Sequence, residues 1–419
     1  MQAHVTAAIL TIAALATAGV ILRPFNLHEA IWALAGAVLL VALRLISPAQ
    51  ALAGVAKGTD VYLFLFGMML LAEIAREEGL FDWLAAIATS HARGSAPRLF
   101  LLIYCVGTVV TIFLSNDATA VVLTPAVAAA VETAKAKQPL PYLLICAFIA
   151  NAASFVLPIS NPANLVIYGS LMPPLLRWLP SYLLPSALSI LATYFALRWT
   201  QRNALKHEIA KDIARPALSW SGKIAAIGIA ATALALLACS TLDLQLGLPT
   251  AIAGAATATA VLISERKGPW SALRNIAWGV LPLVAGLFVL VEALNATGLI
   301  AAIVAFLHDG VARSASLAAW GAGIAVALVS NLINNLPTGL IAGSAVQAAH
   351  APEDVTRAVL IGVDIGPNLS VTGSLATILW LTALRREGHS VGFGAFLKLG
   401  LVVMPPALIL AIGSALLLG

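Results

Sequence analysis

The chain has 419 residues, of which 61% are hydrophobic and 10% are charged, whereas about 25% of the residues in a soluble domain are charged. This composition excludes an ordinary soluble enzyme and indicates a membrane protein, whose length accommodates about ten spans of roughly 20 residues each. The net charge of +5 would suggest a nucleic-acid partner in a soluble protein, but basic loops on the cytoplasmic side of a membrane explain it better. We therefore expect a surrounding lipid bilayer and no nucleic-acid partner.

Apolar segments within residues 1–198 predict the helices of a first repeat. The expected spans are Val5–Leu22, Leu27–Ile46, Val61–Ile74, Tyr142–Val156 and Tyr182–Leu197, and Leu80–His91 is expected at the membrane interface. Between them lies the apolar run 99–131, which polar residues interrupt at 115–119. We predict a re-entrant hairpin whose tip, near residues 115–119, reaches the middle of the membrane. Backbone at that depth is tolerated only where it lines a cavity or is covered by protein.

A second interruption, at residues 158–164, contains Pro158, Asn161, Pro162 and Asn164. Each proline removes a helical hydrogen bond, so this segment is predicted to break a membrane helix. Broken helices of transporters present helix ends and free carbonyl groups to a substrate near the midplane.

A basic linker, residues 199–222, separates the two halves. With its flanking residues it carries Arg198, Arg202, Lys206, Lys211, Arg215 and Lys223. The positive-inside rule places this linker in the cytoplasm. Threading the chain from there puts 18 of the 23 Lys and Arg residues inside, which predicts a multi-pass protein of the inner (plasma) membrane of a prokaryote.

The second half, residues 223–419, repeats the first. Four polar or glycine residues recur at an offset of 219: Glu73 and Glu292, Gly79 and Gly298, Asn116 and Asn335, and Thr119 and Thr338. A second hairpin tip is therefore predicted near residues 334–338, and a second broken helix at 364–374. The stretch after Gly79 is basic and the stretch after Gly298 is nearly neutral, so opposite orientations are expected. The predicted fold is an all-α polytopic membrane protein with two inverted-topology repeats, about ten transmembrane helices and two re-entrant hairpins.

The two tips and the two broken helices are expected to converge on one substrate site. The expected binding residues are Ser115, Asn116, Thr119, Asn161, Asn164, Asn334, Asn335, Thr338, Asn368, Thr372 and Ser374. No Lys or Arg lies in these stretches, which favours a neutral, hydroxyl-bearing solute, although helix N-termini can also hold anions. No catalytic residue, cofactor or metal ligand is predicted, and Cys105, Cys146 and Cys239 are far apart in apolar runs.

Asp117 and Asp364 are the candidates for proton coupling. A carboxyl group in a low-dielectric cavity can bind and release a proton near neutral pH. Each aspartate could instead be a fixed helix cap, and the sequence leaves both interpretations open.

The motifs Ser115–Asp117, Ser160–Asn164, Asn334–Thr338 and Asp364–Trp380 resemble those of ArsB-type arsenite and antimonite efflux permeases of the ion transporter superfamily. The resemblance implies export of arsenite or antimonite as the neutral trihydroxide in exchange for protons, in some systems with a cytoplasmic ATPase subunit. The resemblance is also compatible with a homodimer and does not fix the oligomeric state.

This chain departs from the family pattern at two positions. Asn368 stands where a lysine is frequent, and Asn151 stands where many members have aspartate, so proton coupling could differ. The alternative function is a sodium- or proton-coupled transporter of organic anions (dicarboxylates) or of other metalloids on the same fold. A membrane-embedded enzyme lacks support, because no catalytic motif occurs in the broken helices. The sequence also has no phosphate-binding loop for ATP.

Overall fold

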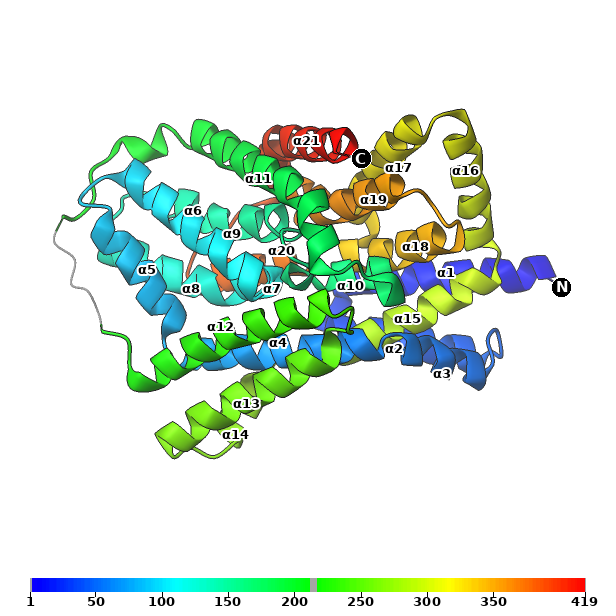
Figure 1. The fold of residues 1–419 in the computed structure, drawn as a ribbon, viewed down its shortest axis with the longest axis horizontal. Coiled ribbons are helices and arrows are strands. Elements are labelled where there is room, and N and C mark those ends of the chain that lie inside the picture. The colour runs from blue at the N-terminus through cyan, green and yellow to red at the C-terminus, as the bar shows by residue number, and fades with distance from the viewer. Residues whose placement is uncertain (1, 212–216, 419) are drawn as a thin grey trace.

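The computed structural model describes residues 2–211 and 217–418, and the regular secondary structure of these residues is helical apart from a single bridge between Ser95 and Glu208. Figure 1 shows most helices running along the long axis of the molecule. Seven helices in the described ranges are long and apolar enough to cross a membrane, and counting two bent helix pairs brings the candidate spans to nine. The prediction of an all-α polytopic membrane protein is confirmed.

The first half contains a long span, a bent pair, a hairpin and a broken helix, in this order. Its helices are α1 (Gln2–Leu22), α2 (Glu29–Ala42), α3 (Pro48–Lys57), α4 (Thr59–Glu77), α5 (Leu80–His91), α6 (Ala96–Phe113), α7 (Asn116–Ala118), the π-helical turn η2 (Thr119–Leu123), α8 (Thr124–Thr133), α9 (Leu140–Ala152), α10 (Pro162–Tyr168) and α11 (Leu175–Thr200). Short 3-10 turns lie between them: η1 (Pro24–Asn26), η3 (Pro158–Ser160) and η4 (Gly169–Leu171). The linker contains η5 (Ala204–Lys206), and its Arg215 lies outside the described residues.

The second half has the same order of elements. It contains α12 (Trp220–Thr241), α13 (Gly247–Glu265), α14 (Trp270–Asn275), α15 (Val280–Ala296), α16 (Leu299–Arg313), α17 (Ala315–Ile333), α18 (Asn335–Ala348), α19 (Glu353–Ile365), the 3-10 turn η6 (Gly366–Leu369), α20 (Leu375–Arg386) and α21 (Phe393–Leu417). The short helices α3 and α14 were not predicted, because neither forms an apolar run of its own.

The two halves run in opposite directions. In Figure 1, α4 leads to α5 at the left end of the molecule, whereas α15 leads to α16 at the right end. Both turns begin with a glycine in the left-handed region, Gly79 at φ 70° and Gly298 at φ 83°, where a side chain would be strained. The repeated glycines therefore turn the chain at opposite ends, as expected for an inverted repeat.

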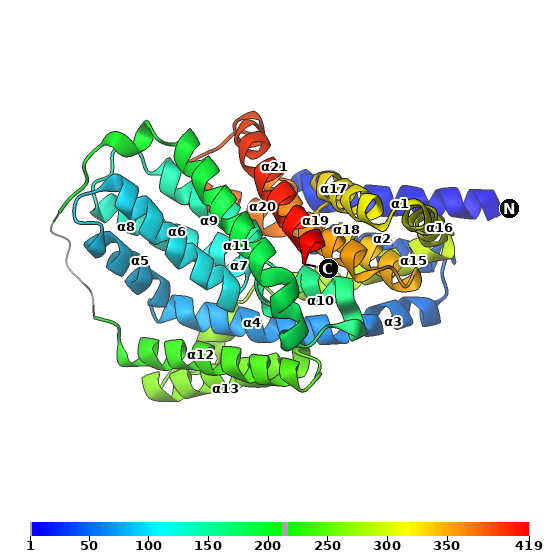
Figure 2. The same cartoon turned by 45° about the horizontal axis from the view of Figure 1, so that its top comes forward.

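Each half packs on the other in a reciprocal way. Helix α4 packs on α13, and its counterpart α15 packs on α2. Likewise α10 packs on α18 of the second hairpin, while α20 packs on η2 and α8 of the first hairpin. The long helices α11 and α21 pack on each other across the molecule (Figure 2). The halves are thus interlocked, and both hairpins face the broken helix of the opposite half.

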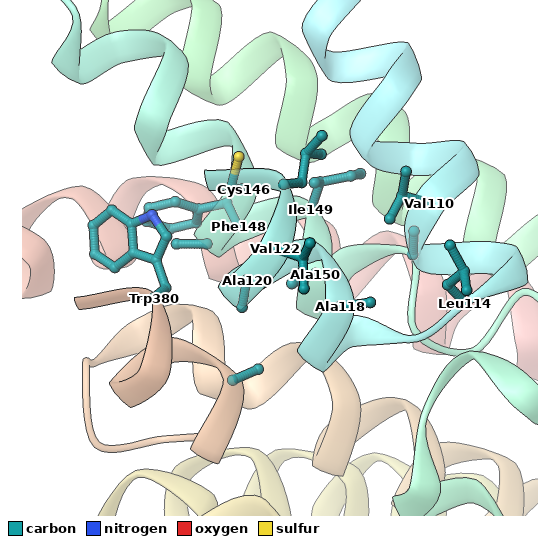
Figure 3. Packing of buried hydrophobic residues seen from close by; sticks show 14 of the residues in the cluster. Val110, Leu114, Ala118, Ala120, Val122, Cys146, Phe148, Ile149, Ala150 and Trp380 are labelled. Atoms are coloured by element: carbon teal, nitrogen blue, oxygen red, sulfur yellow. The ribbon is translucent and has the colours of Figure 1, made fainter. Parts of the chain in front are cut away.

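A dry core surrounds the first hairpin. Figure 3 shows Ala118, Ala120 and Val122 of the hairpin beside Ile149 and Ala150 of α9. The indole of Trp380, from α20, is fully buried on the same side and donates to the carbonyl of Leu143 at 2.9 Å. Polar groups at the tip therefore lie next to tightly packed apolar side chains.

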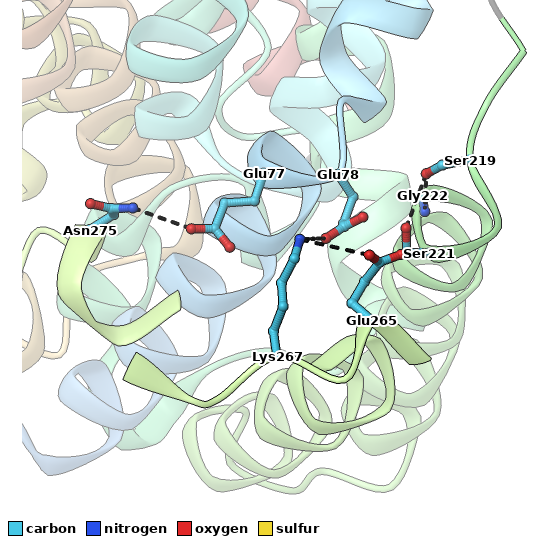
Figure 4. A network of polar contacts seen from close by, with 8 residues as sticks. All are labelled: Glu77, Glu78, Ser219, Ser221, Gly222, Glu265, Lys267 and Asn275. Carbon is cyan, nitrogen blue, oxygen red and sulfur yellow. Dashed lines mark hydrogen bonds and ion pairs between the residues drawn. The ribbon is translucent and has the colours of Figure 1, made fainter. Parts of the chain in front are cut away.

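Ionic contacts gather at the helix ends. Lys267 Nζ lies 3.5 Å from Glu78 Oε1 and 3.9 Å from Glu265 Oε2, which joins the end of α4 to the loop after α13 (Figure 4). The repeat-related Glu73 and Glu292 form ion pairs with Arg76 and Lys57, respectively. The basic partner of each pair is exposed to solvent, and solvent-exposed ion pairs contribute at most about 1 kcal/mol each, so these pairs orient helix ends more than they stabilise the fold.

Candidate functional site

The two hairpin tips adopt unusual backbone conformations at equivalent positions. Ser115, after α6, has φ 149° and ψ 166°, and Asn334, after α17, has φ 74° and ψ 153°. The two residues are 219 positions apart, which is the offset of the sequence repeat. This backbone region is populated almost only by glycine and costs about 1–3 kcal/mol for other residues. Surrounding contacts must therefore hold each tip in place.

Short-range hydrogen bonds hold the first tip. Ser115 Oγ accepts a backbone N–H of α7 at 3.3 Å, and Asn116 Oδ1 accepts the N–H of Asp117 at 2.9 Å. The hydroxyl of Thr119 is buried and lies 2.8 Å from that of Thr111. Ser115 and Thr119 thus serve the turn itself, whereas the amide nitrogen of Asn116 and the carboxyl of Asp117 bond to no other described side chain.

The second tip is bound to the second broken helix. Asn334 Oδ1 caps α18 by accepting a backbone N–H at 3.3 Å, and Thr338 Oγ1 donates to the carbonyl of Asn334 at 2.7 Å. The backbone N–H of Asn335 donates to the carbonyl of Gly373 at 2.8 Å, and Asn334 Nδ2 donates to that of Thr372 at 3.4 Å. These bonds connect α18 to the segment that precedes α20.

The two broken helices restart in the same way. Asn161 Oδ1 accepts a backbone N–H of α10 at 3.0 Å, and Ser374 Oγ accepts one of α20 at 3.0 Å. Such caps satisfy N–H groups that a helix start leaves without partners. Asn161 and Ser374 are 213 residues apart, and so are Asn151 and Asp364, the penultimate residues of α9 and α19. Asp364 is therefore the counterpart of Asn151.

Asp364 near the end of α19 and Asn151 near the end of α9 each form side-chain hydrogen bonds to the other half. Asn161 Nδ2 donates to Asp364 Oδ1 at 2.6 Å. In the reciprocal position, Asn151 Nδ2 donates to Thr377 Oγ1 of α20 at 3.2 Å and to Asn368 Oδ1 at 3.0 Å. Asp364, Asn151 and Asn368 are fully buried. The two broken helices are thus joined by side-chain hydrogen bonds that involve Asp364 and its counterpart Asn151, although the partners of the two residues differ.

A small cavity lies where the tips meet the starts of the two short helices. Three pairs of its lining residues are related by the 219-residue repeat: Asn116 with Asn335, Asp117 with Leu336, and Leu65 with Val284. The remaining lining residues are Asn161 and Pro162 at the start of α10, Val280 at the start of α15, and Leu375 and Ala376 at the start of α20. The volume of about 30 Å³ has room for one water molecule. The cavity therefore lies on the axis that relates the two halves.

The cavity does not include every residue that the sequence predicted for the site. Of the predicted residues, Asn116, Asp117, Asn161 and Asn335 line it. The others do not line it: Ser115, Thr119, Asn164, Asn334, Thr338, Asp364, Asn368, Thr372 and Ser374. Thr372 lines a different cavity of about 490 Å³ together with His28 and Arg385.

The two aspartates have no cationic partner among the described residues. No ion pair there includes Asp117 or Asp364, and Asp364 Oδ2 accepts no hydrogen bond. The amide oxygens of Asn151 and Asn164 are also buried without a partner. Unpaired buried polar atoms are costly, so they mark places where a proton, a water molecule or a substrate hydroxyl can bind.

Sequence reasoning missed one polar residue that organises the second half of the site. Asn331, one turn before the second tip, donates to the carbonyl of Gly366 at 2.9 Å, and its Oδ1 accepts the hydroxyl of Ser370 at 2.7 Å. Its backbone carbonyl accepts the hydroxyl of Thr372 at 2.9 Å. A lone asparagine in the apolar run before a predicted tip was the available signal.

Known proteins resemble this chain in sequence and in fold. The family model described as CitMHS, citrate transporter, matches residues 9–363. The arsenical pump membrane protein of Escherichia coli is 26% identical over 376 residues, and that of Yersinia enterocolitica is 27% identical over 371 residues, each match covering 83% of both chains. The solved YdaH transporter of Alcanivorax borkumensis, 16% identical, matches in fold with a TM-score of 0.57 and covers 99% of this chain and 97% of its own. The chain therefore belongs to the citrate transporter family, CitMHS, and is a multi-pass membrane transporter.

Proposed function

We propose that this transporter exports trivalent arsenite, and antimonite, as neutral trihydroxides in exchange for protons, by alternating access. The observation that carries the proposal is the lining of the cavity between the hairpin tips. It offers the amides of Asn116, Asn161 and Asn335 and the carboxyl of Asp117, but no Lys, Arg or His among the described residues.

The chemistry of this lining suits a neutral trihydroxide. Each hydroxyl of such a solute donates one hydrogen bond and accepts others, and amide side chains offer both functions. A citrate or dicarboxylate ion would bury several negative charges without a cation, which is costly. Transport of such an anion would need bound sodium ions or protons, and we keep it as the second candidate because the family is described by citrate.

Proton exchange would use the two aspartates. Asp117 lines the cavity, and Asp364 is joined to the same cavity through Asn161, whose Nδ2 donates to it at 2.6 Å. A carboxyl group without a cation is more stable in the protonated, neutral form when it is buried. We infer that substrate binding and protonation of these two carboxyl groups exclude each other, which couples the two opposite fluxes.

Two further observations support an arsenic cargo. The relatives from Escherichia coli and Yersinia enterocolitica are arsenical pump membrane proteins. The cysteines Cys105, Cys146 and Cys239 do not line the cavity, and thiolates would hold trivalent arsenic too tightly for a carrier that must release it. The cavity must widen for the trihydroxide, so we infer that the tips and the short helices separate during each cycle.

The decisive experiment measures arsenite uptake into everted membrane vesicles that contain this protein alone. We place the basic linker in the cytoplasm of a prokaryotic cell, so it faces outward in such vesicles. An acidic vesicle interior should then drive uptake, and collapse of the gradient should abolish it. Citrate and sodium serve as competing additions: uptake of citrate, or dependence on sodium, would support the second candidate. Uptake that requires added ATPase subunit would contradict exchange by this chain alone.

A further inference from the structure

A basic hollow lies where the linker meets the first half of the molecule. Five cationic residues line it: Arg93, Arg198, Arg202, Lys206 and Lys211. They come from the loop between α5 and α6, the end of α11, and the linker with η5. The hollow has a volume of about 570 Å³, and Glu208 is its single carboxylate among the described residues. We propose that this hollow binds the phosphate headgroup of an anionic phospholipid.

The five cations of the hollow have no ion-pair partner among the described residues. Arg198 donates to the hydroxyl of Tyr194 at 2.9 Å, and Arg202 donates to the carbonyl of Trp199 at 3.4 Å. Several like charges around one hollow repel each other, and a bound anion relieves that repulsion. The positive-inside rule accounts for basic loops but not for their gathering around one cavity.

The linker is fastened so that the hollow keeps its shape. The backbone N–H of Ile209 donates to the carbonyl of Gly94 at 3.1 Å, and that of Ala210 donates to Ala134 at 2.8 Å. The side chain of Ile209 is buried. These bonds fix Lys206 and Lys211 beside the loop that carries Arg93, so the site is built before a ligand arrives.

The hollow lies at the depth of lipid headgroups. On α11, Leu191, Phe195 and Trp199 are spaced one helical turn apart, and each is at least half exposed, as expected for a face that contacts lipid chains. This stripe ends at Trp199, and the Arg202 guanidinium lies 5.1 Å from the centre of its ring. Tryptophan is enriched at the membrane–water interface, and basic pockets there suit anionic headgroups. This depth favours a lipid over a soluble protein as the ligand.

Lipid counting on the purified, delipidated full chain tests the proposal. Phosphatidylglycerol, phosphatidylcholine and inorganic phosphate are added separately, bound lipid is counted by native mass spectrometry, and the melting temperature is recorded. We expect retained phosphatidylglycerol and a melting temperature raised by a few degrees with that lipid only. Stabilisation by inorganic phosphate alone, or equal binding of phosphatidylglycerol and phosphatidylcholine, would overturn the proposal. The ligand of the hollow would then be a soluble anion or an acidic protein.

Matched variants locate the site. R93Q/R202Q/K206Q removes three charges from the hollow and should lose the phosphatidylglycerol effect. R98Q/K135Q/K137Q removes three exposed charges that do not line it and should keep the effect. R93K/R202K keeps the charges and should also retain the lipid, and the melting temperature of each variant without added lipid shows whether that variant is folded. Equal loss in the first two variants would refute a defined site, because it would indicate general surface attraction. The proposal does not depend on the transported substrate.

Discussion

The two halves of the site share their geometry but not their ionisable groups. The first tip has Asp117 where the second has Leu336, and the second broken helix has Asp364 where the first has Asn151. Backbone conformation, helix caps and crossing hydrogen bonds recur in both halves. The comparison teaches that duplication supplies the frame of the cavity, while each half contributes one carboxyl group, from a different kind of element.

The largest effect should come from removing either carboxyl group. We expect D364N and D117N to fold normally and to lose nearly all gradient-driven arsenite uptake, because an amide cannot carry the exchanged proton. The measurement is vesicle uptake with and without the pH gradient. L336N, which adds a polar group at the counterpart of Asp117 without removing a carboxyl, should keep the gradient response. A D117N/D364N double variant that still responds to the gradient would end the proton-carrier assignment.

Moving the carboxyl group from the second broken helix to the first tests whether the two broken helices are equivalent in function. In N151D/D364N the carboxyl stands in α9 rather than α19, at the position that the 213-residue offset makes equivalent. We expect part of the gradient-driven uptake to return relative to D364N. Its pH profile should be altered, because Asn368 and Thr377 replace Asn161 as neighbours. No recovery in a stable variant would mean that the two broken helices are equivalent in shape only.

Removal of either helix cap should have a smaller effect on uptake, and the two cap variants should differ in the pH dependence of uptake. N161A and S374A each remove a cap, which costs about 0.5–2 kcal/mol, and both should lower the melting temperature. Only N161A also removes the hydrogen bond to Asp364, so only this variant should shift the pH at which uptake is half-maximal. A shift of the same size in S374A would argue that the cap, rather than the bond to the carboxyl, sets the pH response.

The smallest effect concerns the backbone of the tips. At Ser115 and Asn334, glycine variants should be more stable than alanine variants by about 1 kcal/mol, because glycine tolerates positive φ. Ser186, buried inside α11, is the control, and there alanine should be the more stable. Thermal unfolding in detergent compares the six variants. A preference for alanine at both tips would show that the tips are not strained.

Most of the correct sequence predictions came from the polar residues that interrupt apolar runs in both halves. The tips at Ser115 and Asn334 and the helix that begins after Gly79 lie where the pattern placed them, because a polar break in an apolar run is costly in lipid and persists only where protein covers it. The reciprocal packing could not be predicted, since α2 and α15 are both apolar except near one end, and an apolar helix surface does not identify its partner helix. The hydrogen bond between Asn161 and Asp364 joins residues 203 apart in sequence, so it depends on that packing. The roles within the site remain predictions.

Reciprocal packing also bears on how the protein is made. Helices leave the ribosome and enter the membrane in chain order, so α2 and α4 are inserted well before α15 and α13 exist. Until α19 is synthesised, Asn161 cannot form its hydrogen bond to Asp364. The first broken helix then lies in the membrane without the second broken helix that it packs against. A nascent chain stalled after the linker is therefore incomplete in its core as well as in its site. We expect membrane quality-control proteases to remove such fragments quickly.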